Sequence, residues 1–174
     1  MKLRDIIIIV VIAVSIFLVT RVVIQNFVVD GESMLPNLKG KEWVLVNKVV
    51  YKLHPPERGD IIVFNSPSAS VPRVLIKRVI GLPGETVKID NGNVYIDDKL
   101  LDESSYIDVS TTRNGTWTLG EGKHFVLGDN RPSSSDSRTW GAVDQANIIG
   151  KAWLRIWPFS VWGFAPNYRP VLTE

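Results

Sequence analysis

The sequence has no cysteine, which excludes disulfide frameworks, thiolate metal sites and a cysteine nucleophile. It has only two histidines, His54 and His124, and no pair of metal-type ligands recurs at a diagnostic spacing. The formal net charge is +2 and no long basic run is present, so the usual footprint of a nucleic-acid-binding protein is missing. We therefore expect no metal, no cofactor and no nucleic-acid partner.

An uncharged and almost wholly apolar stretch, Ile6–Val19, lies close to the N-terminus. A helix that crosses a bilayer needs about 20 predominantly apolar residues, so this stretch alone is short. Arg21 lies near its end, where a long side chain can reach the membrane interface, and the candidate span then extends to Ile24. We therefore expect residues 1–26 to comprise a short cytoplasmic N-terminus and a transmembrane helix.

Two other interpretations of this run are a cleaved signal peptide and a buried segment of a soluble protein. No small-x-small cleavage site follows the run, and so uniform a run at a chain end is not typical of a soluble core. Lys2 and Arg4 precede it, so the positive-inside rule predicts a cytoplasmic N-terminus, although Arg21 weakens that signal. The sequence thus predicts a single-pass protein of the cell membrane, with residues 27–174 outside the cytoplasm.

Beyond this run, short stretches rich in β-branched residues alternate with glycine and proline. Asn91-Gly92 stands between two alternating runs, a pattern typical of a β-hairpin. No convincing amphipathic helix appears. We predict a mainly β fold, in which one transmembrane helix is followed by one β-rich domain of antiparallel strands. Strands are expected within residues 43–50, 60–64, 73–80, 86–96, 124–127 and 147–157.

The segment "GESMLPNL" places Ser33 among hydrophobic residues soon after the apolar run. A serine in a loop is most often a solvated or turn-forming hydroxyl, and it becomes a nucleophile only when a base accepts its proton. His54 precedes two prolines in an expected exposed turn, and His124 lies in a strand without an obvious orienting carboxylate. Both histidines are therefore interpreted as structural.

A lysine can serve as the base when burial keeps its amine neutral. In "RVLIKRVI", strand alternation puts Lys77 between Leu75 and Val79 on one face. Such a lysine either extends to solvent at the sheet rim or is buried with a lowered pKa. Arg78 cannot take the role because guanidinium does not deprotonate at usable pH. Ser33 and Lys77 form a candidate dyad, and both placements of the lysine remain open.

Four segments follow the apolar run in the order "GESMLPNL", "GDIIVF", "KRVIGLPGE" and "GDNRPSSSDSR". The last is serine-rich like a linker, but its mixture of aspartates, arginines and glycines favours an ordered loop at residues 128–141. Together the four segments resemble the type I (leader) signal peptidases of bacteria over nearly the whole chain. Four motifs in this order, with the serine and the lysine present, are a specific signal. The resemblance implies a β-rich fold whose strands coil around the site.

The resemblance also implies a role for individual residues. Ser33 matches the nucleophile of the family, and Lys77 matches its general base. Ser134 matches the hydroxyl that orients the lysine amine, and Asp136 and Arg138 match an ion pair that braces this loop. The walls of the substrate groove are expected to include Val29, Met34, Leu75 and Ile76.

Three positions depart from the family pattern. Asn37 replaces a threonine and can still form a local hydrogen bond. Gly31 stands where some members carry a serine that donates to the oxyanion, so the oxyanion hole would rely on backbone N–H groups such as that of Ser33. Asp144 replaces a proline after "WGxV", which leaves the conformation of that turn open.

We therefore expect a membrane-anchored serine endopeptidase that removes signal peptides from exported preproteins. An extended substrate would add as a strand beside residues 75–77. Since alternate side chains then face one wall, small residues are expected one and three positions before the cut, an Ala-x-Ala pattern. The lipid bilayer is the second expected partner. Trp153, Trp157, Phe159 and Trp162 form either an aromatic surface at the membrane interface or an ordinary core strand.

Three alternatives share some of these features. A self-cleaving repressor-type protease uses the same dyad, but it carries a DNA-binding domain where this chain has its apolar run. A specialised peptidase of a pilus or conjugation system would have the same motifs. A catalytically silent, membrane-tethered β-domain that binds partners is the third alternative, and the presence of both Ser33 and Lys77 argues against it.

Overall fold

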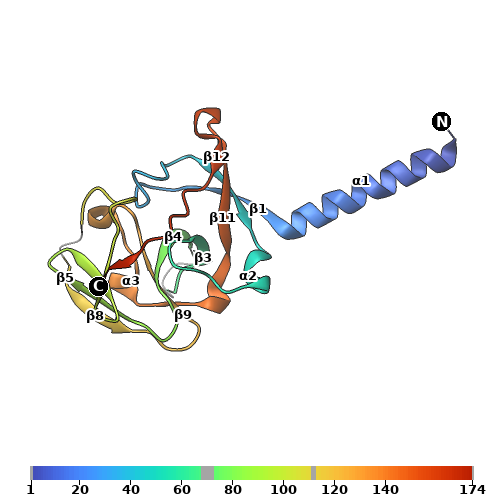
Figure 1. Ribbon diagram of the computed structural model, residues 1–174. Coiled ribbons are helices and arrows are strands. Elements are labelled where there is room, and N and C mark those ends of the chain that lie inside the picture. The colour runs from blue at the N-terminus through green and yellow to red at the C-terminus, as the bar shows by residue number, and fades with distance from the viewer. Residues whose placement is uncertain (1, 68–72, 111–112, 174) are drawn as a thin grey trace.

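The computed structural model describes residues 2–67, 73–110 and 113–173, and it consists of one long helix that projects from a β-rich domain (Figure 1). Helix α1 (Leu3–Val23) contains the apolar run and is not covered by the domain. Its 21 residues correspond to a length of about 32 Å, close to the thickness of the hydrocarbon core of a bilayer. Among the residues described, α1 is the one helix that is long and apolar enough to cross a membrane.

Helix α1 passes directly into strand β1 (Ile24–Val28). The backbone becomes extended at Ile24 because the strand pairs with residues 43–47 of β2. The N–H of Lys48 also donates to the carbonyl of Val23 at 2.8 Å, which fastens the end of the helix to the domain. The boundary predicted after residue 26 therefore falls inside β1.

The larger sheet has eight strands in the order β1-β2-β11-β3-β4-β9-β10, with β12 paired to β11. Neighbouring strands are antiparallel, and the register shifts at bulges in β11 and β4 bend the sheet. Its other strands are β2 (Trp43–Asn47), β3 (Ile61–Asn65), β4 (Val74–Gly81), β9 (Lys123–Leu127), β10 (Val143–Asp144), β11 (Ile148–Trp157) and β12 (Gly163–Phe164).

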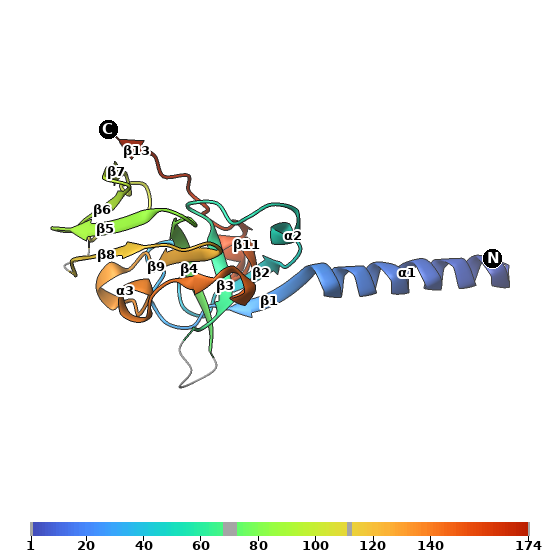
Figure 2. The same cartoon turned by 90° about the horizontal axis from the view of Figure 1, so that it is seen from below.

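The smaller sheet has five strands in the order β13-β7-β6-β5-β8, and it lies at the end of the domain far from α1 (Figures 1 and 2). The predicted hairpin joins β5 to β6, and both turn residues, Asn91 and Gly92, have positive φ angles of 47° and 86°. Positive φ at both positions matches the right-handed twist of the flanking strands. The strands are β5 (Thr86–Asp90), β6 (Asn93–Ile96), β7 (Lys99–Leu101), β8 (Gly115–Thr118) and β13 (Leu172–Thr173).

The prediction of a mainly β, antiparallel fold is confirmed, and each predicted strand segment contains a strand. The sequence analysis missed β1, whose residues read as part of the apolar run, and several strands of only two to four residues. So short a strand carries too little alternation to be recognised. Beyond α1 the described helices are short: α2 (Val50–Leu53), α3 (Ser137–Trp140), and the 3-10 turns η1 (Arg131–Ser133), η2 (Gln145–Asn147) and η3 (Phe159–Val161).

Strand β4 has one free backbone edge, which positions the candidate site. Along its first part, residues 74–78 pair with β3 on one side. On the other side, pairing with β9 begins only at Arg78. Residues 74–77 therefore present an open strand edge, to which an extended chain can add by main-chain hydrogen bonds.

The four C-terminal aromatic residues lie at the surface. Trp153 and Trp157 on β11 are 41% and 48% exposed, and Phe159 and Trp162 are 68% and 64% exposed. The Trp157 and Phe159 rings meet edge to face at 5.0 Å, and Phe159 stacks on Trp162 at 6.0 Å. The alternative of an ordinary core strand is therefore wrong for these side chains, and they form an exposed aromatic surface.

Candidate active site

Lys77 lies in the middle of β4 and contacts Ser33 directly. Its Nζ donates to Ser33 Oγ at 2.7 Å and to the Ile76 carbonyl at 2.8 Å. The lysine is only 3% exposed, so of the two placements that the sequence left open, the buried one is observed. Ser33 and Lys77 are 44 residues apart in the chain, and only the tertiary fold brings them into contact.

Burial lowers the pKa of Lys77 from its ordinary value to about 8, because an ammonium loses hydration in the protein interior. The negative charges of Asp136 and Asp129 act in the opposite direction. Each of these carboxylates is engaged by an arginine, Asp136 by Arg138 and Asp129 by Arg78, at 2.7 Å. The lysine amine can therefore be deprotonated in the mildly alkaline range.

The loop that carries Ser33 is fixed from two sides. Met34 and Leu38 are completely buried and pack against the larger sheet. Asn130 holds the other side, since its N–H donates to the Ser33 carbonyl at 3.0 Å and its Nδ2 donates to the Glu32 carbonyl at 3.1 Å. These contacts hold the backbone at Ser33 in place.

Residues 128–141 form an ordered loop, as predicted from the sequence. Asp136 caps α3 and forms a bidentate ion pair with Arg138, with both contacts at 2.7 Å. The Gly128 N–H also donates to Asp136 at 3.1 Å, which ties the loop to the end of β9. Arg138 in turn donates to the carbonyls of Arg131 and Ser134. The ion pair thus closes the loop on itself.

Ser134 lies beside the Ser33 backbone, but its hydroxyl forms no hydrogen bond with the lysine amine in this structure. Its Oγ is buried and has no hydrogen-bond partner among the described residues. A Cβ placed on Gly128 would lie 2.2 Å from Ser134 Oγ and 2.5 Å from the Ser33 carbonyl oxygen. Gly128 is therefore the residue that allows the two serines to approach each other.

Gly128→Ala is expected to lower both turnover and stability, because the added methyl group would displace the Ser33 backbone and the Ser134 hydroxyl. Overpacking of this kind costs about 1–3 kcal/mol. Gly120→Ala is the matched control, since a Cβ there meets only Lys123 Cγ at 3.9 Å. Thermal unfolding and peptide cleavage of both variants test this expectation. Equal behaviour of the two would show that the space at Gly128 is unimportant.

A buried charge network lies behind the loop that carries Ser33, and it was not predicted from the sequence. The Arg78 guanidinium binds Asp129 through two hydrogen bonds of 2.8 and 2.7 Å, and both side chains are inaccessible to solvent. Asn37 donates to Asp129 at 2.9 Å and to the Tyr106 carbonyl at 2.7 Å. Asn37 therefore forms long-range hydrogen bonds rather than the expected local one. Asp129, in the motif "GDN", was the signal available in the sequence.

The predicted substrate-binding residues occupy different environments. Val29, Met34 and Ile76 are buried in one core cluster, whereas Leu75 is partly exposed and packs against another. Leu75 shares the face of β4 that carries Lys77. Their assignment to a substrate groove remains a prediction.

The structure also shows the environments of the two histidines that were considered as bases and of Asp144, which departs from the family pattern. His54 is exposed, and His124 is buried, with a pKa lowered by burial. Neither histidine forms a hydrogen bond with Ser33 in the described part of the chain. Asp144 lies in β10 and forms an ion pair with Lys123 at 2.6 Å. Residues 2–67, 73–110 and 113–173 contain no group of three or more metal-type side chains that could hold an ion.

Comparison with known proteins places these observations in context. Residues 3–157 match the family described as "Signal peptidase, peptidase S26". A "Signal peptidase IB" of Staphylococcus aureus is 36% identical and covers 92% of this chain and 91% of its own. A "Probable signal peptidase I-1" of Synechocystis is 42% identical over 78% of this chain and 72% of its own. A crystal structure of a signal peptidase I from Enterococcus faecalis covers 55% of this chain and 95% of its own at 39% identity, with a TM-score of 0.48.

Proposed function

Because the chain belongs to the signal peptidase family, peptidase S26, we propose that it uses Ser33 as nucleophile and Lys77 as general base to remove signal peptides from exported preproteins. The contact of 2.7 Å between Lys77 Nζ and Ser33 Oγ carries this proposal. This contact also argues against a catalytically silent β-domain. Burial of a lysine costs free energy, and a catalytic role explains why the chain retains it there.

The reaction begins when the neutral Lys77 amine takes the proton of the Ser33 hydroxyl. Ser33 Oγ attacks the carbonyl carbon before the scissile bond, and the C–N bond then breaks as Lys77 returns the proton to the leaving amine. An acyl-enzyme remains on Ser33. Lys77 next takes a proton from water, which attacks the ester, and Ser33 Oγ leaves with the proton. The pKa of about 8 lets one amine serve as both base and acid.

The developing oxyanion needs hydrogen-bond donors, and we assign the Ser33 N–H to this role. Within the described ranges this N–H has no hydrogen-bond acceptor, so it is free to bind the oxyanion. Gly31 has a φ angle of 80° and offers no side-chain donor. Ser134 is proposed to hold the lysine amine, because its unpartnered, buried hydroxyl lies next to the Ser33 backbone.

The substrate is proposed to add as a strand to the open edge of β4 at residues 74–77. Main-chain hydrogen bonds would supply affinity, and alternate side chains would point at one wall beside Ile76. The core clusters around Ile76 and Met34 leave that wall closely packed, with both side chains buried. Only small substrate side chains fit against such a wall.

A preprotein with Ala-x-Ala before the scissile bond is expected to be cut at that bond. Phe or Lys immediately before the bond should lower kcat/KM by at least about 10²-fold, since one badly accommodated group costs roughly 3 kcal/mol. The measurement compares matched peptides and identifies the cleaved bond by mass spectrometry. Equal rates for Ala and Phe would contradict the packed wall. Cleavage of pilus or conjugation proteins alone would identify a specialised copy.

We further propose that α1 spans the membrane with its N-terminus in the cytoplasm and the catalytic domain outside. Helix α1 has the required length, and Lys2 and Arg4 precede it. The exposed aromatic surface defined by Trp153, Trp157, Phe159 and Trp162 is suited to the membrane interface, where amphipathic rings gather. This placement brings Ser33 close to substrates that arrive from the bilayer.

A further inference from the structure

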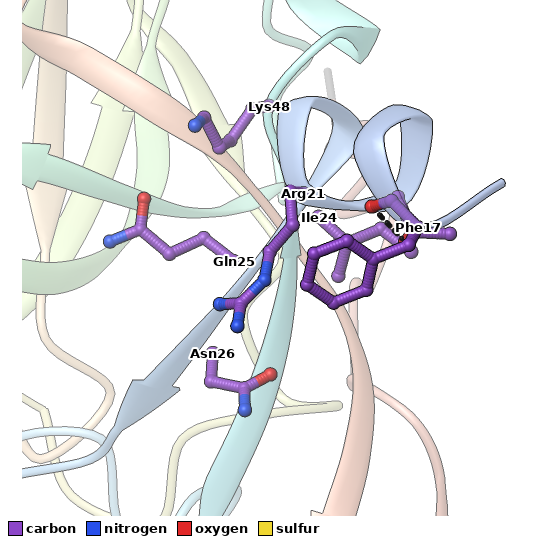
Figure 3. A pocket seen from close by; sticks show the side chains of 7 residues that line it. Phe17, Arg21, Ile24, Gln25, Asn26 and Lys48 are labelled. Carbon is purple, nitrogen blue, oxygen red and sulfur yellow. Dashed lines mark hydrogen bonds between the residues drawn. The ribbon is translucent and has the colours of Figure 1, made fainter. Parts of the chain in front are cut away.

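A pocket of about 630 Å³ opens where α1 meets the domain (Figure 3). Figure 3 shows the Arg21 side chain extending from the helix past the side chains of β1, with Lys48 on the other side of Gln25. The proposed catalytic residues are not part of it. Its wall includes Phe17 and Arg21 of α1, Ile24, Gln25 and Asn26 of β1, and Lys48.

The pocket is cationic. Arg21 and Lys48 are its charged residues, and no carboxylate lines it. Neither side chain forms an ion pair or a hydrogen bond within the described chain, whereas five arginines of the domain are paired with carboxylates. The amides of Gln25 and Asn26 add neutral donors beside the two cations. This set of donors is suited to the oxygens of a phosphate group.

The pocket also has an apolar side, which is formed by Phe17 of α1 and Ile24 of β1. Phe17 lies one turn before Arg21, and the guanidinium carbon is 5.2 Å from the centre of its ring. Ile24 extends this side at the start of β1. A ligand that fills the pocket would therefore be amphiphilic, with its charged end at Arg21 and Lys48 and its apolar part along Phe17.

Its depth relative to the bilayer matches such a ligand. With α1 across the hydrocarbon core, its last turn and the first residues of β1 lie at the level of the lipid headgroups. The charge of Arg21 on this side runs against the positive-inside pattern. A bound anionic headgroup would explain why an unpaired cation is placed there.

We propose that this pocket binds the phosphate headgroup of an anionic phospholipid from the extracytoplasmic leaflet, with Arg21 and Lys48 on the phosphate and Phe17 against the glycerol and first acyl carbons. The proposal rests on the transmembrane placement of α1. Since no residue separates α1 from β1, a lipid bound at this junction would restrain the domain relative to the helix. The open edge of β4 would then stay at a constant height above the membrane.

Native mass spectrometry of the full chain, released from uncharged detergent micelles, tests the site with phosphatidylglycerol and phosphatidylcholine as probes. The wild type should retain phosphatidylglycerol in preference to phosphatidylcholine. The double variant Arg21→Gln/Lys48→Gln should bind phosphatidylglycerol about thirtyfold more weakly, which corresponds to about 1 kcal/mol for each cation. Lys88→Gln/Lys99→Gln removes the same charge from exposed positions of the smaller sheet and should change nothing.

Two results would overturn the proposal. Equal binding of phosphatidylglycerol by the wild type and the Arg21/Lys48 variant would exclude the pocket. Displacement of the lipid by an equal concentration of glycerol 3-phosphate would point to a soluble phosphate instead, because the contact with Phe17 would then contribute nothing.

The outcome can be separated from that of the proposed function. Cleavage of a soluble peptide in micelles should be the same for the double variant and the wild type, since neither residue belongs to the catalytic machinery. If the wild type itself did not cleave the peptide, the peptidase proposal would be contradicted. Lipid binding is measured without any substrate, so it would be unaffected by that result. A C-terminal tag that is digested in intact spheroplasts supports the extracytoplasmic leaflet; a tag digested only after lysis overturns it.

Discussion

Ser33→Ala and Lys77→Met are each expected to lower single-turnover cleavage of a preprotein by about 10⁴-fold or more, the scale found when a nucleophile or its base is removed. Ser33 supplies the attacking oxygen, and the Lys77 amine is the group observed in contact with it. The matched control is Ser135→Ala, an exposed hydroxyl of the 128–141 loop that should leave turnover unchanged. Near-normal turnover by either folded variant would disprove the dyad.

The same substitution at Lys77 should stabilise the fold. The unfolded lysine has a pKa of 10.5 and the folded one a pKa of about 8, so the buried ammonium costs about 3 kcal/mol at pH 7. Methionine has a similar volume and no charge, although the Ile76 carbonyl and the Ser33 hydroxyl each lose a hydrogen bond worth about 1 kcal/mol. Thermal unfolding at pH 7 should therefore show a higher Tm for Lys77→Met than for the wild type. A lower Tm would show that burial of the charged Lys77 amine does not destabilise the folded protein.

The pH dependence of kcat/KM should follow the neutral fraction of Lys77, because kcat/KM reports the free enzyme. With a pKa of about 8, the rate should rise about 90-fold between pH 6 and pH 9 and then level off. The sign follows from the base role, since only the deprotonated amine accepts the serine proton. Asp136 and Asp129 raise this pKa, so Asp136→Asn should move the midpoint to lower pH.

A different profile would identify a different base. An acid limb near pH 6.5 that His124→Gln removes would transfer the role to histidine. The structure argues against this result, because burial lowers the pKa of His124 and this histidine forms no hydrogen bond with Ser33 in the described part of the chain.

The stability of the protein should rise over the window from about pH 8 to about pH 10.5, as the folded lysine loses its charge before the unfolded one does.

Local sequence patterns predict several features of this protein. The uncharged run predicts α1, and Asn91-Gly92 predicts the turn between β5 and β6, because both depend on residues that are neighbours in the chain. The ordered motifs around Ser33 and Lys77 indicate the family. Each of these signals is a periodicity or a short motif, which a single sequence displays directly.

The tertiary structure alone decided which polar groups are buried and paired. Alternation left Lys77 either solvated or buried, and the fold buries it against Ser33 from a segment 44 residues away. Arg78 meets Asp129 across 51 residues, and Asn37 meets Asp129 across 92. The aromatic side chains of β11 have the composition of a core strand, yet they lie at the surface. Burial and pairing depend on which distant segments pack together, and desolvation and charge contacts that set a pKa exist only after they have packed.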